Sequence, residues 1–182
     1  TANAMYERTQ DCYRHFFSTP EKASLVLSHS ARHLSETFRQ SIISPLHQGT
    51  VKHIGEPTGS SQCAAWLADN RKKAMLAHIG VGTIDQALLG ILPARHQCLR
   101  LFGLATKVLV VDEVHAYDSY MLELVQRLIA FQARIGGSAI LLSATLPIST
   151  KEKLVSAYKG GLDVDIGIGL NKDAYPLALR FD

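Results

Sequence analysis

The sequence has few cysteines, little net charge and no long hydrophobic run. Its three cysteines (Cys12, Cys63 and Cys98) are far apart and form no C-x-x-C pair. This pattern argues against a disulfide framework and a structural zinc site, and it suggests a reducing compartment. The apolar stretches are far shorter than the roughly 18 residues that a membrane span needs. The net charge of +3 is too small to indicate nucleic-acid binding by itself. We therefore expect a protein of a reducing compartment without a membrane partner.

The length and composition are those of one ordinary globular domain. The chain has 182 residues, of which 47% are hydrophobic and 19% are charged, which is enough material to bury a core. No signal peptide opens the sequence, and Thr1 stands in a stretch with helical spacing, without an initiator Met. We therefore expect the sequence to be a piece of a longer protein.

Apolar periodicity alternates between helices and short strands. Helical spacing is found over residues 2–17, around 34–42 and 62–73, at 119–135 and from 149 onward; short apolar runs occur at 24–28, about 76–81, 107–111 and 139–142. A run rich in Gly, Ser, Thr and Pro at 47–61 predicts an exposed loop. Strands that are apolar on both faces and joined by helices predict a parallel sheet covered on both sides. The predicted fold class is α/β.

Several helix ends carry recognisable signals. Thr83 with Gln86, and Ser149 with Glu152, have the spacing of a capping box. The helix from 119 to 135 should be capped by Asp118 or Ser119 and closed by two glycines. Its expected inner face consists of Met121, Leu124, Val125, Leu128, Phe131 and Ile135, and the closing glycines are Gly136 and Gly137.

Two adjacent carboxylates follow the strand at 107–111. Ligands of open parallel sheets bind at the carboxyl ends of the strands, so Asp112 and Glu113 lie where a ligand is expected. They suit a hydrolase of nucleoside triphosphates, in which the first acid holds Mg²⁺ through water. The second acid would then orient and deprotonate the attacking water. The alternative for an isolated pair is that both acids merely cap the next helix.

A second polar group follows the next strand. Residues 143–145 (Ser143, Ala144 and Thr145) come directly after the strand at 139–142, one helical connection beyond Asp112. Alone, this tripeptide would be a plain turn. Together with the string D-E-V-H at residues 112–115, it favours a nucleotide site.

The same strings carry a family resemblance. D-E-V-H followed by S-A-T resembles motifs II and III of the DEAD/DEAH-box helicases of superfamily 2. The longer strings at 81–89 (VGTIDQALL), 111–118 (VDEVHAYD) and 141–147 (LLSATLP) resemble the type I CRISPR-associated helicase-nuclease. Residues 1–6 are similar to the stretch after that family's motif Ia, and residues 174–177 to the end of its first RecA-like lobe.

The resemblance implies part of a three-layer, mostly parallel RecA-like sheet with helices on both faces. Residues 1–182 would cover this lobe from the end of motif Ia. The sequence contains no G-x-x-x-x-G-K-[ST] and no His-Asp dipeptide. The phosphate loop and its strand, the HD nuclease domain and the second lobe are therefore expected elsewhere in the intact protein. The chain alone is expected to be inactive.

The family's residue roles transfer to matching positions. Asp112 resembles the Mg²⁺-holding acid, through water, and Glu113 the base that activates water for ATP hydrolysis. His115 resembles the histidine that couples the nucleotide site to motif III, with Ser143 and Thr145 as its partners. Thr83 and Gln86 resemble contacts to the DNA backbone, although they also fit a capping box.

The family uses ATP and Mg²⁺ to travel 3′ to 5′ on single-stranded DNA. It is recruited by the crRNA-guided surveillance complex to degrade foreign DNA in the prokaryotic cytoplasm. The alternatives are a superfamily 2 helicase outside CRISPR immunity, or a non-catalytic binding module derived from one. A local basic cluster (Arg95, His96, Arg100 and Lys107) could face phosphates, but a solvated helix face is the favoured interpretation.

Overall fold

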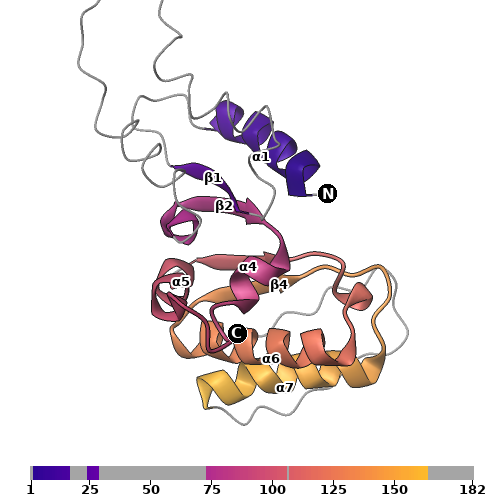
Figure 1. Cartoon of the computed structure of the whole chain (residues 1–182). Coiled ribbons are helices and arrows are strands. Elements are labelled where there is room, and N and C mark those ends of the chain that lie inside the picture. The colour runs from indigo at the N-terminus through magenta and orange to yellow at the C-terminus, as the bar shows by residue number, and fades with distance from the viewer. Residues whose placement is uncertain (1, 17–23, 29–72, 106, 164–182) are drawn as a thin grey trace, which may run out of the picture. The chain divides into compact units, whose positions relative to one another are not determined.

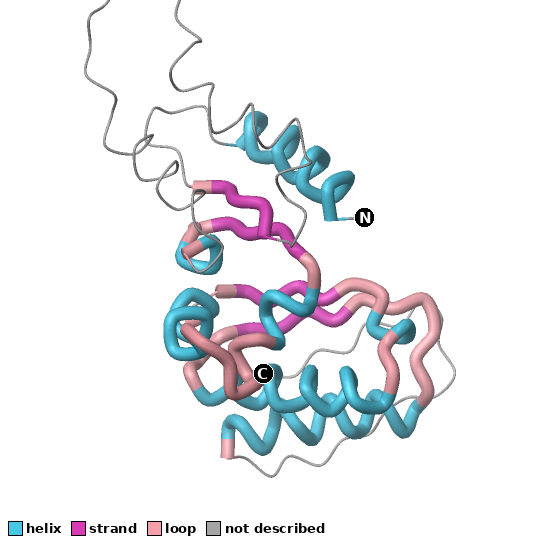
Figure 2. The backbone as a smooth tube through the Cα atoms, viewed as in Figure 1, coloured by secondary structure: helices cyan, strands magenta, loops and turns pink. Residues whose placement is uncertain are grey.

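The computed structural model describes residues 2–16, 24–28, 73–105 and 107–163. They belong to two compact units, one within residues 1–107 and the other within 108–182. Each unit contains a two-stranded parallel sheet with a helix in contact with it (Figures 1 and 2). The predicted α/β class is confirmed. The predicted loop at 47–61 and the helix around 34–42 lie outside the described residues, as does nearly all of the helix around 62–73.

The first unit is built around one small apolar core. Its elements are α1 (Ala2–Phe16), β1 (Leu25–Ser28), η3 (Ala74–Leu76), β2 (Ile79–Gly82), α4 (Ile84–Leu88) and α5 (Gln97–Leu104). The buried core side chains are Tyr6, Val26, Leu27, Ala74 and Ala77. Helix α1 thus contributes the aromatic ring of Tyr6 to the core that it shares with the sheet.

Strands β1 and β2 run in parallel, with Leu25 opposite Ile79 and Ser28 opposite Gly82. The start of this pairing is fixed by a serine and a histidine. The backbone amide of Ser24 donates to His78 Nδ1 over 3.1 Å, and the amide of His78 donates to Ser24 Oγ over 3.0 Å. The strand expected at about 76–81 begins later, at Ile79, because Leu76 belongs to the 3₁₀ helix η3 and residues 77–78 form a bend.

The second unit carries the strand ends that the sequence singled out. Its elements are β3 (Val108–Val111), η4 (Val114–Ala116), α6 (Ser119–Arg134), β4 (Ser138–Leu141) and α7 (Ile148–Leu162). Strands β3 and β4 pair in parallel, with Val111 opposite Leu141. Helices α6 and α7 lie side by side (Figure 1).

One face of the β3–β4 sheet is apolar and exposed in the part of the chain that the structure describes. Val108 and Val110 keep 58% and 56% of their surface exposed, and Ile140 and Leu142 keep nearly half. The alternating residues of the same strands are more buried. The sheet is therefore covered on one face here, whereas its composition predicts cover on both.

The ends of α6 follow the predicted signals. Asp118 precedes the helix, and its carboxylate accepts a hydrogen bond from the amide of Met121 over 2.8 Å. At the other end Gly136 has φ 74°, and the amides of Gly136 and Gly137 bond Ala133 and Gln132. This is the Schellman arrangement, in which glycine adopts a left-handed conformation without steric cost.

Two helix predictions need correction. The buried residues of α6 are Leu124, Val125, Leu128, Ile129, Gln132 and Ala133, so Met121, Phe131 and Ile135 are only partly buried. The buried stripe is rotated around the helix axis relative to the predicted one, because α7 packs on α6. The prediction considered only large apolar residues, so it omitted Ala133 and Gln132. The Ser149–Glu152 capping box does not form, because α7 already begins at Ile148 behind Pro147.

No helix in the described ranges is both long and apolar enough to cross a bilayer.

Adjacent glycines of α7 provide a test of the α6–α7 contact. A Cβ on Gly161 would meet the carbonyl oxygen of Ala130 and lie 2.8 Å from the Cβ of Ala133, whereas a Cβ on Gly160 would meet nothing within 4 Å. We expect Gly161→Ala to destabilise the fold by about 1–3 kcal/mol through overpacking. Gly160→Ala should stabilise it by up to about 1 kcal/mol, because alanine favours helix. Urea unfolding of both variants measures the difference, and equal midpoints would contradict the close packing.

Candidate functional site

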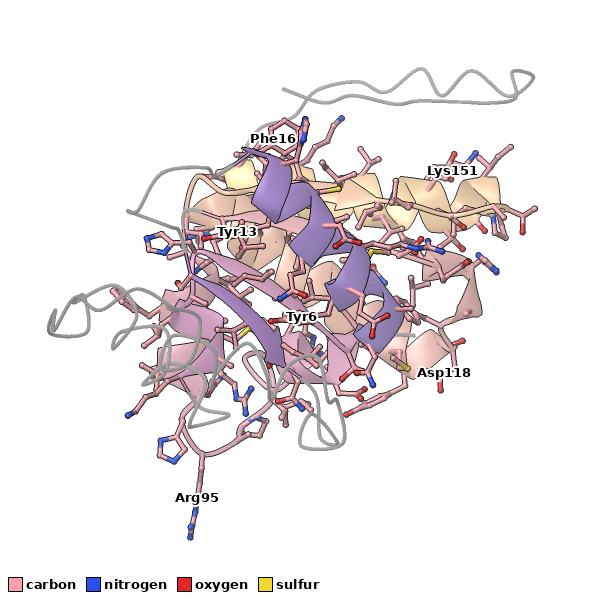
Figure 3. The ribbon with its side chains drawn as sticks, turned by 90° about the horizontal axis from the view of Figure 1, so that it is seen from above. Tyr6, Tyr13, Phe16, Arg95, Asp118 and Lys151 are labelled. Atoms are coloured by element: carbon pink, nitrogen blue, oxygen red, sulfur yellow. The ribbon has the colours of Figure 1, made fainter. Side chains whose placement is uncertain are left out.

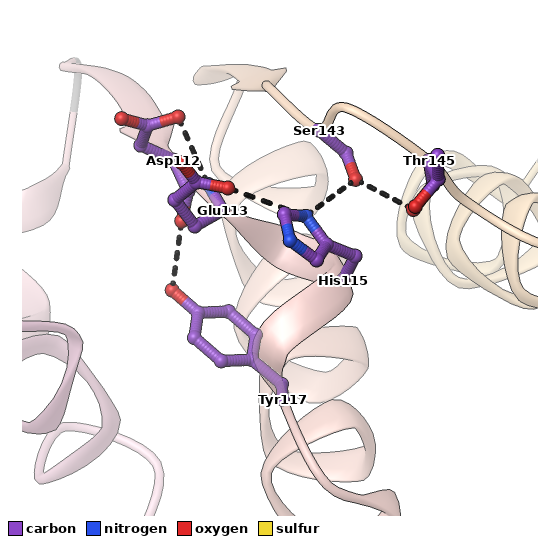
Figure 4. Close-up of polar contacts among 6 residues, drawn as sticks. All are labelled: Asp112, Glu113, His115, Tyr117, Ser143 and Thr145. Carbon is purple, nitrogen blue, oxygen red and sulfur yellow. Dashed lines mark hydrogen bonds and ion pairs between the residues drawn. The ribbon is translucent and has the colours of Figure 1, made fainter.

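The pairing of β3 with β4 brings two polar segments together. Beyond the last strand pair, the amide of Leu142 donates to the carbonyl of Val111 over 2.8 Å, and the amide of Val114 donates to the carbonyl of Leu142 over 3.1 Å. The chain after β3 is thus hydrogen-bonded to the chain after β4. Residues 112–115 and 143–145 lie next to each other as a result (Figure 4).

Asp112 and Glu113 occupy a tight, exposed turn. The amide of Glu113 donates to Asp112 Oδ1 over 2.9 Å, and the hydroxyl of Tyr117 donates to the Asp112 carbonyl over 3.2 Å (Figure 4). Glu113 has φ 56° and ψ 41°, the left-handed region that a side chain rarely adopts. Such backbone costs on the order of 1–3 kcal/mol and clusters at functional sites. The acids do not cap α6, since Asp118 does that.

His115 connects the Glu113 carboxylate with the segment after β4. Its Nδ1 lies 3.3 Å from Glu113 Oε2 and 3.2 Å from Ser143 Oγ. The Ser143 hydroxyl donates its own proton to the carbonyl of Thr145 over 3.0 Å, so Ser143 can only accept from His115. Since a carboxylate also accepts, both neighbours require the proton to be on Nδ1. The contacts therefore place a proton on Nδ1, and in the neutral ring this is the Nδ1–H tautomer.

Thr145 takes part in this chain through its backbone. Its carbonyl oxygen, and not its hydroxyl, receives the Ser143 proton. The sequence predicts hydroxyl partners for His115 from both Ser143 and Thr145. Among the described residues, only the Ser143 hydroxyl contacts His115. The side chain of Thr145 is exposed.

The donor set of Asp112 fits a magnesium ion held through water. Carboxylate oxygens are hard ligands, and Mg²⁺ retains several of its waters in protein sites. Asp112 is exposed, and one of its two oxygens is engaged by the amide of Glu113. The described residues contain no group of three His, Cys, Asp or Glu side chains that could hold a metal ion directly.

Thr83 and Gln86 belong to the other unit, at the start of α4. Thr83 precedes the helix as predicted, but its side chain makes no capping hydrogen bond. The Gln86 side chain accepts from Arg100 Nη1 over 3.3 Å. The capping box predicted for these two residues is therefore absent. Arg100 engages the glutamine, and the Thr83 amide, which the glutamine would accept from in a capping box, donates instead to the Ser28 carbonyl over 3.3 Å.

The predicted basic cluster does not form one solvated face. Arg95 extends away from the ribbon, and His96 is also exposed (Figure 3). The Arg100 side chain is buried, and Lys107 Nζ donates to the carbonyls of Met75 and Gly103. Burial lowers the pKa of both cations.

Sequence reasoning missed the contacts that support the site. Tyr117 holds the turn at Asp112, and the backbone of Leu142 holds the turn at Val114. Tyr117 lies in the string that carries the family resemblance, so its position offered a signal. The backbone contacts of Leu142 follow from strand register and have no sequence signal.

Comparison with known proteins finds relatives of this chain among CRISPR-associated proteins. No model of a known protein family matches it. The chain is 44% identical, along all of its length, to the "CRISPR-associated endonuclease/helicase Cas3" of Escherichia coli (strain K12). It is 37% identical over 88% of its length to the Thermus thermophilus protein of the same name. It spans 20% and 17% of these relatives, respectively.

Solved structures give the same result. The structure described as "Crystal structure of T. fusca Cas3-ATP" matches 97% of this chain with a TM-score of 0.69 and 33% identity. The T. fusca Cas3-ADP structure matches 88% of the chain with a TM-score of 0.66 and 38% identity. The chain covers 18% and 16% of those two proteins.

The His115 contacts predict a fixed imidazole tautomer. In the wild-type chain we expect the neutral ring to carry its proton on Nδ1, because Ser143 and Glu113 both accept there. Ser143→Ala combined with Glu113→Ala should release this preference, as both acceptors are lost. Thr145→Ala is the matched control and should leave the tautomer unchanged, since the carbonyl remains. ¹⁵N chemical shifts of the ring measure this, and an Nε2-protonated ring in the wild type would refute the assignment.

Proposed function

Because the chain is homologous along its whole length to one segment of the CRISPR-associated helicase-nucleases named Cas3, we propose that residues 1–182 form part of their first RecA-like helicase lobe. The motor would hydrolyse ATP to move along single-stranded DNA. The relatives are named as endonuclease/helicases, and the chain covers about a fifth of them. The nuclease and the second lobe would then belong to other parts of the full-length protein.

One observation carries this proposal: the hydrogen-bonded cluster at the ends of β3 and β4. It joins two acids, a histidine and a serine from segments 28 residues apart in the sequence. The bound nucleotides named for the T. fusca Cas3 structures are ADP, ATP and AMPPNP. These names support ATP as the ligand of the parent protein. A non-catalytic binding module derived from a helicase would not need to keep this set of side chains.

The two acids have different proposed roles. Asp112 would hold the water shell of Mg²⁺ with its exposed carboxylate. The ion, when bound, supplies charge neutralisation for the phosphates. Glu113 is placed by its left-handed backbone and by the Nδ1–H of His115, so that its remaining oxygen can orient the attacking water and accept a proton from it.

His115 and Ser143 would couple the nucleotide site to the segment after β4. A change in the position of Glu113 alters the bond to His115 Nδ1, and that nitrogen also donates to Ser143. Ser143 in turn holds the Thr145 carbonyl just before α7. A shift at the nucleotide is thereby transmitted to the segment between β4 and α7. Such a junction between a strand and a helix is able to move.

The proposed partners are single-stranded DNA and a crRNA-guided surveillance complex. One similar solved structure is described as "CRISPR RNA-guided surveillance complex, pre-nicking", with a TM-score of 0.52 and 31% identity. Thr83 and Gln86 would contact the DNA backbone, since neither side chain is engaged in a capping box. Such a protein would act in the prokaryotic cytoplasm. A helicase acting outside CRISPR immunity is disfavoured by the names of these relatives.

Substitutions of the two acids should separate their roles in the full-length protein. We expect Glu113→Gln to reduce ATP hydrolysis by about 100-fold or more while retaining ATP binding, because an amide keeps the shape but accepts no proton. Asp112→Asn should also weaken Mg²⁺-dependent ATP binding, since it removes the charge opposite the ion. Steady-state hydrolysis and binding of a labelled ATP analogue with and without Mg²⁺ measure both effects. Glu123→Gln, on the exposed face of α6, is the control. Equal loss of ATP binding in both acid variants would refute the separate roles.

The coupling role predicts different outcomes for the two hydroxyl residues. Ser143→Ala should leave DNA-stimulated ATP hydrolysis within about threefold of wild type but lower unwinding about fivefold or more, because the acceptor for His115 is lost. Thr145→Ala should affect unwinding less, since only its carbonyl contacts Ser143. The ratio of base pairs unwound to ATP consumed is the measurement. An unchanged ratio in Ser143→Ala would contradict the coupling role.

A further inference from the structure

The side chain of Arg100 is a buried cation in the first unit. It retains only 7% of its surface, and no ion pair with a carboxylate is found for it among the described residues. Its Nη1 donates to the backbone carbonyl of Gln86 over 3.1 Å and to Gln86 Oε1 over 3.3 Å. Its Nε has no hydrogen-bond partner in the described part of the chain. Burying a charged group costs free energy unless hydrogen bonds or ion pairs offset the loss of hydration. The two hydrogen bonds to Gln86 are therefore the contacts that must be understood.

The bond to the backbone stabilises the end of a very short helix. Helix α4 has five residues, and a helix of this length is marginal without tertiary support. The amide of Gly90, which would bond the Gln86 carbonyl in a continued helix, bonds Ala87 instead. Arg100 supplies the missing donor, and its charge suits a helix C-terminus. The conformation of α4 thus depends on a side chain from α5.

The bond to the side chain orients the glutamine amide. Oε1 is the only acceptor of this group, and a guanidinium can only donate. With Oε1 held by Arg100, the Nε2 amino group is left with two donor hydrogens and no acceptor within the described residues. An oriented group of this kind can bind an acceptor, such as a phosphate oxygen.

Helix α5 is itself firmly anchored. Lys107 Nζ, just beyond its end, donates to the carbonyls of Met75 and Gly103. A Cβ on Gly103 would lie 2.7 Å from the Met75 carbonyl carbon, so α5 packs closely on the segment that leads into β2. Arg100 therefore projects from a fixed helix toward the segment that follows β2.

From this geometry we propose that Arg100 is a positioning residue for nucleic-acid binding: it holds Gln86 so that the Nε2 amino group donates to a phosphate oxygen of the DNA strand. The inference rests on the proposed function, in which Gln86 contacts the DNA backbone. Arg100 does not touch the DNA itself, because its guanidinium is buried and occupied by Gln86. The recognised chemistry is a backbone phosphate, so the contact is independent of base sequence.

A double-mutant cycle tests this in the full-length protein with a labelled oligo-dT strand. Arg100→Leu and Gln86→Leu should each weaken binding about three- to tenfold, the range expected for one lost hydrogen bond. The double variant should bind no more weakly than Gln86→Leu, because Arg100 acts only through Gln86. At saturating DNA, kcat for ATP hydrolysis should change little while the DNA concentration for half-maximal activity rises. Arg127→Leu, an exposed arginine of α6, is the matched control and should bind as wild type.

The salt dependence separates positioning from direct contact. If Arg100 acts through a neutral amide, the slope of log Kd against log salt should be the same in Arg100→Leu and wild type. A direct phosphate contact by Arg100 would instead reduce the slope by about 0.7. A reduced slope, or additive losses in the cycle, would overturn the positioning role.

Two further variants keep the inference testable if Arg100→Leu fails to fold. Gln86→Glu retains the acceptor for Arg100 but offers a carboxylate in place of the donor, so it should fold normally and lose DNA affinity about tenfold or more. Wild-type affinity in Gln86→Glu would refute the proposed donor. Arg100→Lys retains the charge without the paired donors of the guanidinium and should restore part of the affinity lost in Arg100→Leu.

If Gln86→Leu binds DNA normally, the proposed contact itself is wrong, and the role of Arg100 is refuted with it. If only Arg100→Leu binds normally, the positioning role alone is refuted.

Discussion

The candidate site depends on the parallel pairing of β3 with β4. Parallel strands end at the same edge, so the segment after Val111 and the segment after Leu141 necessarily emerge side by side. The backbone bonds of Leu142 to Val111 and Val114 extend this pairing beyond the strands. A shift of the register by one residue would separate His115 from Ser143. The chemistry proposed for the site is therefore a consequence of strand register.

Within this frame, the Glu113 carboxylate is held by local constraints and not by burial. Glu113 is exposed, and its position is determined by a left-handed backbone and by the Nδ1–H of His115. A solvent-exposed contact of this kind contributes little to stability, so the contacts of Glu113 are better suited to orientation than to folding. The strain in the backbone of Glu113 can persist because Tyr117 and Leu142 hold the residues on either side.

In the first unit, the key polar side chain is buried, whereas Glu113 in the second unit is exposed. Arg100 is this buried side chain, and its hydrogen bonds maintain a five-residue helix that could not persist alone. The apolar core of Tyr6, Val26 and Leu27 fixes the sheet, and the histidine–serine contact sets its register. The position and donor orientation of Gln86 thus follow from its direct contact with Arg100 of the next helix.

The sequence alone determined the α/β fold class and most helix and strand positions within the described residues, and its strings indicated the resemblance to the Cas3 proteins. Apolar periodicity located β1, β3, β4 and α6, and Asp118 and Gly136 marked the ends of α6, because such signals act over only a few residues. The strings around Asp112 and Ser143 led to the prediction of a nucleotide site, and the structure brings the two segments together. Tertiary structure alone decided which contacts these residues make. The capping boxes are absent because Arg100, 14 residues along the chain, engages the side chain of Gln86, and because α7 begins behind Pro147, two residues before the start that a Ser149 cap requires. Likewise, the Nδ1 proton of His115 and the use of the Thr145 carbonyl depend on distances between segments, which local sequence does not encode.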